Sequence, residues 1–221
     1  MLSFSIINYG FGASVIWLYA FRLYKSYKRK RLPQFKYAFL ATLSIGLGLS
    51  SYFIFPFFWP KNSFLMGIGY VMGQIFVALG FVATAKALAS LVSAKNTLLK
   101  FAPFLILTAG AIVTAIHIVY FGYPWLDDNG LIHWNQHTVT KIAVFILNAF
   151  IEVPIGIAFV LKSPAELKLK LKSIVFGLAF ILCGTGGVLV VVFDNSPSLF
   201  LFYSIYFAGF LSFLITLLVP D

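Results

Sequence analysis

The chain has 221 residues, of which 61% are hydrophobic and 10% are charged, and its mean hydropathy is +0.98. This balance excludes an ordinary soluble domain, in which about a quarter of the residues are charged. The net charge of +10 would suit a nucleic-acid partner, but the basic residues cluster between apolar runs, which favours a membrane surface instead.

Seven apolar runs of roughly twenty residues predict transmembrane helices, because lipid offers the backbone no hydrogen-bond partners. The predicted fold class is an all-α integral membrane protein, with residues 1–221 forming a single seven-helix transmembrane domain. The first run has no basic segment before it, so we do not expect a cleaved signal peptide. The predicted spans are residues 4–22, 36–55, 63–88, 101–121, 138–161, 170–193 and 197–218.

The distribution of basic residues predicts the orientation of these spans. Three segments around the inner ends of the spans, residues 22–36, 86–100 and 162–172, hold seven, three and four basic residues, whereas the opposite side holds only Lys61 and Lys141. Basic residues are retained on the cytoplasmic side, so we expect the N-terminus outside and the C-terminus inside. The expected location is the cytoplasmic membrane of a bacterium or archaeon.

A basic cluster follows the first span. It could attract anionic lipid of the inner leaflet, although a role in fixing the topology alone is the favoured interpretation. The cluster consists of Lys25, Lys28, Arg29, Lys30 and Arg31.

The second and third spans carry prolines and glycines with predictable effects. Pro56 and Pro60 are expected to prevent the second helix from continuing, because proline has no backbone N–H. Gly69, Gly73 and Gly80 share one face of the third span, which predicts close packing on a neighbouring helix. Dimerisation through that face is the less favoured alternative.

Three polar residues interrupt the third and fourth spans. Lys86 lies near the inner end of its span, where its side chain can reach the membrane surface. His117 lies near the outer end of the fourth span, where a satisfied hydrogen-bond donor is favoured over a ligand or a proton carrier. Gln74 lies between the glycines of the third span and is a candidate member of a polar core.

The stretch before the fifth span predicts a short β-hairpin. Residues 123–126 and 131–134 flank the turn sequence Asp-Asp-Asn-Gly at 127–130, and Asn and Gly accept positive φ. Two strands alone are marginally stable, so the hairpin is expected to pack across the outer ends of the helices. Trp125 and Trp134 are the candidate ligand-contacting residues of such a lid, and an irregular aromatic loop is the alternative.

His133 and His137 are four residues apart, a spacing that suits a metal site when both lie on one helix face. However, His133 belongs to the predicted hairpin and His137 to the start of the next helix. We therefore predict no metal site here.

The fifth span carries the acid expected at membrane depth. Lys141, Asn148 and Glu152 point within about 40° of each other, while Lys141 and Glu152 are roughly 16 Å apart along the axis. Pro154 frees a backbone carbonyl near the acid, which predicts a kink. Glu152 is then a candidate functional site or, equally, a packing hydrogen bond. Its candidate partners are Asn148, Gln74, Lys86 and Thr185.

The last two spans carry further signals. Ser163 and Ser196 each precede a proline, which predicts helix N-caps. The seventh span contains no lysine, so the retinal Schiff base of microbial rhodopsins is excluded and no cofactor is predicted. The single cysteine, Cys183, allows no internal disulfide.

Seven spans in this orientation, with the long outer stretch 127–134 before the fifth, resemble the seven-helix sensor region at the N-terminus of some bacterial histidine kinases. The resemblance covers nearly the whole chain and rests on topology, without a diagnostic motif. It implies a sensor or receptor module for a small molecule or a membrane state. Because no transmitter domain follows before Asp221, we expect a signalling partner protein, with a truncated gene product as the alternative.

Two other classes compete with the sensor interpretation. The first is a small proton- or ion-coupled transporter that uses Glu152 as its coupling acid. The second is a membrane enzyme, which is disfavoured because no cluster of His, Asp and Glu has a spacing suited to catalysis.

Overall fold

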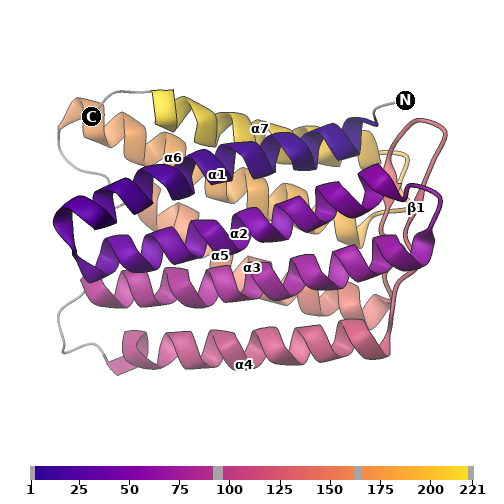
Figure 1. The fold of residues 1–221 in the computed structure, drawn as a ribbon, viewed down its shortest axis with the longest axis horizontal. Coiled ribbons are helices and arrows are strands. Elements are labelled where there is room, and N and C mark those ends of the chain that lie inside the picture. Colours follow the sequence, from indigo (N-terminus) through magenta and orange to yellow (C-terminus); the bar gives the residue numbers. More distant parts are fainter. Residues whose placement is uncertain (1–2, 92–96, 162–165, 219–221) are drawn as a thin grey trace. The chain divides into compact units, whose positions relative to one another are not determined.

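The computed structural model describes residues 3–91, 97–161 and 166–218. Seven helices in these ranges are long and apolar enough to cross a membrane, and a two-stranded sheet lies between the fourth and fifth, which confirms the predicted fold class at this level (Figure 1). The elements in chain order are α1 (Phe4–Lys30), α2 (Pro33–Phe58), α3 (Ser63–Leu91), α4 (Thr97–Val119), β1 (Trp125–Leu126), β2 (Ile132–His133), α5 (Thr138–Leu161), α6 (Leu167–Val192) and α7 (Leu199–Leu218).

Helix α1 is longer than the first predicted span, because the basic cluster continues the helix beyond the apolar run. Its last turn carries Lys28, Arg29 and Lys30, whose charges interact favourably with the negative end of the helix dipole. The next residue, Arg31, has a positive φ of 54°, and its N–H donates to the carbonyl of Tyr27. This left-handed residue ends the helix.

The prediction that Pro56 stops the second helix is wrong. Helix α2 contains Pro56 and continues to Phe58, where the N–H of Trp59 donates to the carbonyl of Phe55 at 2.9 Å. Proline so close to a helix end removes a single intrahelical hydrogen bond, which the last turn tolerates. Pro60 follows directly after the C-cap.

The chain forms two compact units. The hairpin unit comprises Met1–Asn8 and Gly122–Asp221, and the basic unit comprises Tyr9–Phe121. The sequence of the basic unit has eleven lysines and arginines and no aspartate or glutamate.

In the basic unit, α3 packs against both α2 and α4. The glycine face of α3 allows α2 to approach closely, which confirms the predicted packing. A Cβ atom added to Gly80 would lie 2.6 Å from Ile45 of α2. Cβ atoms added to Gly69 and Gly73 would likewise overlap the rings of Phe55 and Tyr52.

In the hairpin unit, α6 packs against both α5 and α7. Gly156 and Gly177 allow α5 and α6 to approach closely, since a Cβ on either would lie 2.6 Å from the carbonyl oxygen of the other. Helix α7 begins at Leu199, two residues after the predicted start of the seventh span at residue 197. Before the helix, the hydroxyl of Ser196 accepts a hydrogen bond from the N–H of Ser198. The predicted cap Ser163 lies outside the described residues, and Glu166 is the N-cap of α6.

Candidate functional site

The hairpin of the hairpin unit has the predicted place and turn. Strands β1 and β2 pair antiparallel, with Trp125 opposite His133 and Leu126 opposite Ile132. Gly130 has a φ of +76° and its N–H donates to the carbonyl of Asp127 at 3.0 Å. The strands have two residues each, so contacts outside the sheet hold the hairpin in place.

The carboxylate of Asp127 organises the turn from within. One oxygen accepts the N–H of Leu131 at 2.7 Å, and the other lies 3.3 Å from Nε2 of His133. Burial favours the neutral form of this acid. The hydrogen bonds from Leu131, His133 and Asn129 outweigh burial, however, and hold the pKa of Asp127 below its usual value.

An exposed aromatic surface lies on the outside of the hairpin. The ring of Trp125 stacks on the imidazole of His133, with 4.0 Å between the centroids and 4° between the planes. Trp125 keeps 44% of its surface exposed, whereas Trp134 keeps only 1%. Of the two predicted lid tryptophans, Trp125 therefore offers a contact surface and Trp134 belongs to the packed interior.

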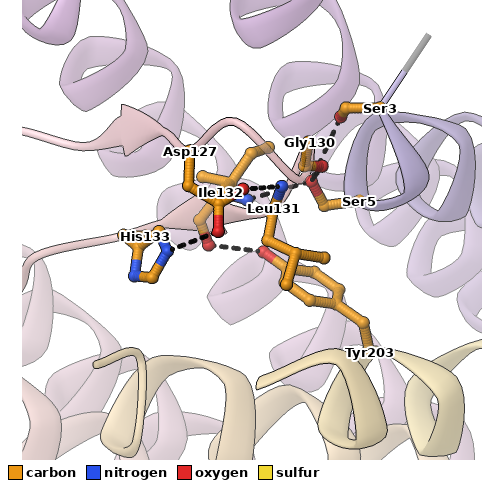
Figure 2. Close-up of polar contacts among 8 residues, drawn as sticks. All are labelled: Ser3, Ser5, Asp127, Gly130, Leu131, Ile132, His133 and Tyr203. Atoms are coloured by element: carbon orange, nitrogen blue, oxygen red, sulfur yellow. Dashed lines mark hydrogen bonds and ion pairs between the residues drawn. The ribbon is translucent and has the colours of Figure 1, made fainter. Parts of the chain in front are cut away.

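Two buried hydroxyl groups bind the hairpin to helices α1 and α7. The hydroxyl of Ser5 donates to the carbonyl of Gly130 and accepts the N–H of Ile132, both at 3.0 Å. The hydroxyl of Tyr203 donates to the carbonyl of Ile132, also at 3.0 Å (Figure 2). Both backbone polar groups of Ile132 are thus satisfied by helix side chains. Sequence reasoning identified neither Ser5 nor Tyr203.

A buried carboxylate holds the segment that follows the hairpin. Asp194, between α6 and α7, is 0% exposed and accepts the N–H of Asn135 at 2.6 Å. Its other oxygen lies 2.5 Å from Nζ of Lys141, near the start of α5. The predicted site residue Lys141 is therefore the ion-pair partner of Asp194, a residue that sequence reasoning did not name as its partner.

Glu152 lies deeper in the hairpin unit. It is part-buried on α5 and faces α6, where a Cβ added to Gly184 would lie 3.1 Å from its Cγ. The amide of Asn148 donates to Val144 of its own helix, and the candidate partner Thr185 is exposed. No hydrogen bond joins Glu152 to another residue in the part of the chain that the structure describes.

The remaining predicted site residues belong to the basic unit. His117 is fully buried, with Nδ1 2.7 Å from the carbonyl of Val113 and its ring 5.2 Å from that of Tyr70. Lys86 is exposed, as expected for a side chain that reaches the surface, and Gln74 is part-buried. Their predicted pairing with Glu152 of the hairpin unit stays a prediction.

Within residues 3–91, 97–161 and 166–218, no three His, Cys, Asp or Glu side chains gather as they would around a metal ion. Asp127 and His133 form a pair. His137 lies apart from the strands, and its Nδ1 accepts the N–H of Val139 at 3.3 Å.

Comparisons with protein-family models, with curated proteins and with solved structures found no significant match. The resemblance to histidine-kinase sensor regions therefore stays a prediction.

Proposed function

We propose that the chain is a multi-pass membrane sensor whose hairpin lies outside and receives the signal. In this proposal the N-terminus is outside, the C-terminus is inside, and a partner protein reads the inner connections. One observation supports the proposal most. A single loop carries the exposed Trp125, stacked on His133. The same loop is hydrogen-bonded to the ends of three helices, through Ser5, Lys141–Asp194 and Tyr203.

The hydrogen bonds of Ile132 supply a mechanism for relaying a contact. A two-residue strand is easily deformed, but both backbone polar groups of Ile132 are held by buried partners, Ser5 and Tyr203. Leaving such a buried group unsatisfied costs about 1–3 kcal/mol. A ligand that shifts β2 therefore moves the starts of α1 and α7 together instead of breaking these bonds.

The chemistry of the stack suggests the class of ligand. The exposed indole of Trp125 offers a flat apolar face, and beside it the carboxylate of Asp127, paired with His133, keeps lone pairs that can accept a further hydrogen bond. This combination suits a small molecule that has an aromatic or cationic part and one polar group.

The matched tryptophans Trp125 and Trp59 allow a direct test, because 44% and 43% of their surfaces are exposed. Purified protein would be screened against small molecules by the shift in its melting temperature. We expect Trp125→Ala to abolish the shifts that bound molecules cause, and Trp59→Ala to retain them. Normal binding of every such molecule by Trp125→Ala would show that the hairpin is not the receptive element.

A coupled transporter is the second candidate function. The supporting observation is Glu152, a part-buried acid on a membrane-length helix without a hydrogen bond to other described residues. For this function, proteoliposomes should show proton- or ion-dependent uptake that Glu152→Gln abolishes. Unchanged uptake in that variant would exclude Glu152 as the coupling acid.

A further inference from the structure

An apolar groove runs between α3 and α4 of the basic unit. Its volume of about 380 Å³ lies within the range of small-molecule sites. The groove is hollow because small residues lie between larger aliphatic ones, and the helices approach so closely that a Cβ on Gly110 would lie 2.8 Å from Ala78. Its lining includes Ile75, Leu79, Val82, Leu107, Gly110 and Ala111.

On α3, the helix face that lines the groove also carries a lysine, Lys86. Ile75, Leu79 and Val82 share one helix face with Lys86, which lies one turn, or about 6 Å, beyond Val82. The side chain of Lys86 is exposed, and its Nζ lies 6.0 Å from the centroid of the Tyr37 ring. An apolar groove with a positive charge beyond one end matches the shape of a lipid with an anionic headgroup.

The basic unit contains no carboxylate that could neutralise this charge. Some of its cations lie over aromatic rings instead: Lys30 is 5.3 Å from the centroid of Phe35, and Arg31 is 5.8 Å from that of Tyr27. Cation–π contacts leave the positive charge in place. Within Tyr9–Phe121, Lys86 therefore has no carboxylate as a counter-ion, and an anionic headgroup can take that place.

We propose that the α3–α4 groove and Lys86 bind one anionic phospholipid, with an acyl chain in the groove and the phosphate beside Nζ of Lys86. In a bilayer the groove contributes fit and dispersion contacts, because lipid tails are as apolar as the protein surface that they cover. Selectivity among lipids then depends on the headgroup charge, to which a lysine near the membrane surface contributes about 1 kcal/mol.

Charge disfavours a second copy of the chain as the occupant of the groove. A two-fold symmetric contact would place this face against itself and bring together two patches that both contain Lys86. Neither patch could supply an acid, since Tyr9–Phe121 contains none.

The test measures phospholipid binding to the full chain in detergent by native mass spectrometry. Phosphatidylglycerol and phosphatidylcholine with identical acyl chains are compared, and phosphatidylglycerol should bind more tightly. Lys86→Gln should weaken phosphatidylglycerol binding about fivefold, the factor that corresponds to one surface lysine, and leave phosphatidylcholine binding unchanged. Lys61→Gln, an equal loss of charge in the α2–α3 connection, should change neither.

A second variant tests the groove itself. Ala111→Phe fills it from an exposed position and should weaken both lipids, whereas Ala158→Phe, at an exposed position on α5, should weaken neither. Equal effects of Lys86→Gln and Lys61→Gln would overturn the proposal, as would equal binding of the two lipids by the native chain. A change of oligomeric state in Ala111→Phe with unchanged lipid binding would also overturn it, because the groove would then hold a second copy.

Discussion

Asp127 is the residue on which the hairpin turn most directly depends, and its charge makes the turn sensitive to acid. Its folded pKa lies below its usual value, which is about 3.9 in an unfolded chain. The stabilisation is therefore complete above about pH 4 and is lost as the pH falls through the folded pKa. Acid should loosen the hairpin at this carboxylate.

Replacing Asp127 by Asn is expected to destabilise the protein at pH 7 by about 1–2 kcal/mol, since two charge-assisted hydrogen bonds are weakened. The measurement is the melting temperature in detergent as a function of pH. The difference from the native chain should shrink below about pH 4, where the native carboxylate also becomes neutral. Asp128→Asn removes the same charge from an exposed neighbour, so equal losses in the two variants would contradict this role of Asp127.

The ion pair of Lys141 with Asp194 leads to a second prediction. In Lys141→Met, the fully buried carboxylate of Asp194 would keep the N–H of Asn135 as its partner but lose its counter-ion. We expect the free energy of unfolding to fall by about 3–5 kcal/mol. Denaturant unfolding in mixed micelles measures this loss, with Lys61→Met as the control. The double variant Lys141→Met, Asp194→Leu should recover part of the stability. If the double variant loses the sum of the single losses, the pair is not coupled.

Some residues of the candidate site could be predicted from the sequence, whereas others could not. Trp125 and the turn at residues 127–130 were predicted because their signals are local, and Lys141 was noticed as a charge in an apolar span. Ser5, Asp194 and Tyr203 were missed because their partners lie 127, 53 and 71 residues away along the chain. A serine in a first helical turn or a tyrosine in a span is ordinary until the fold brings the hairpin to it.

At the scale of helices, the close contact of α3 with α2 predicts opposite effects of two similar substitutions. Gly73→Ala would drive a methyl group into the ring of Tyr52, which lies between Tyr9 and Tyr70 with centroids 5.4 and 5.7 Å away and has little room to move. We expect a loss of about 1–3 kcal/mol from overpacking.

Gly187→Ala on α6 is the matched control for Gly73→Ala. The nearest atom to its new methyl group would be a ring carbon of Tyr206 at 3.5 Å, an ordinary contact. Alanine favours helix more than glycine, so stability should stay equal or rise by up to about 1 kcal/mol. Melting temperatures of both variants check the pair. Equal losses would show that glycine spacing on α3 does not determine the packing.

The elements themselves were largely predictable from the sequence. Thr138–Leu161 has the predicted bounds of the fifth span, because a sharp polar loop precedes it and its apolar residues continue to Leu161 despite Lys141 and Glu152. The predicted helix boundaries were wrong where a segment is too polar for the membrane, or contains proline, and yet forms helix. The cluster ending at Lys30 is too polar for lipid yet is a good helix former, and Pro56 is tolerated within the last turn of α2.

For the whole molecule, the asymmetry of charge predicts the topology. With the N-terminus outside, a reporter fused after Asp221 should behave as cytoplasmic: green fluorescent protein should fluoresce there, and alkaline phosphatase should be inactive. Single cysteines at Lys61 and Asp128, in a Cys183→Ser background, should react with a membrane-impermeant reagent added to intact cells. Labelling that requires broken cells would show the opposite orientation.

The separation of charge between the units also makes acid a selective probe. All six carboxylate side chains follow residue 121 and so belong to the hairpin unit. In the basic unit, His117 is the one residue of a type that normally changes its charge between about pH 4 and 8. A rapid drop in pH therefore changes the protonation of one unit while the charge of the other stays nearly constant. Any spectroscopic response to such a jump that persists in His117→Phe can be assigned to Met1–Asn8 or Gly122–Asp221, without a label on either.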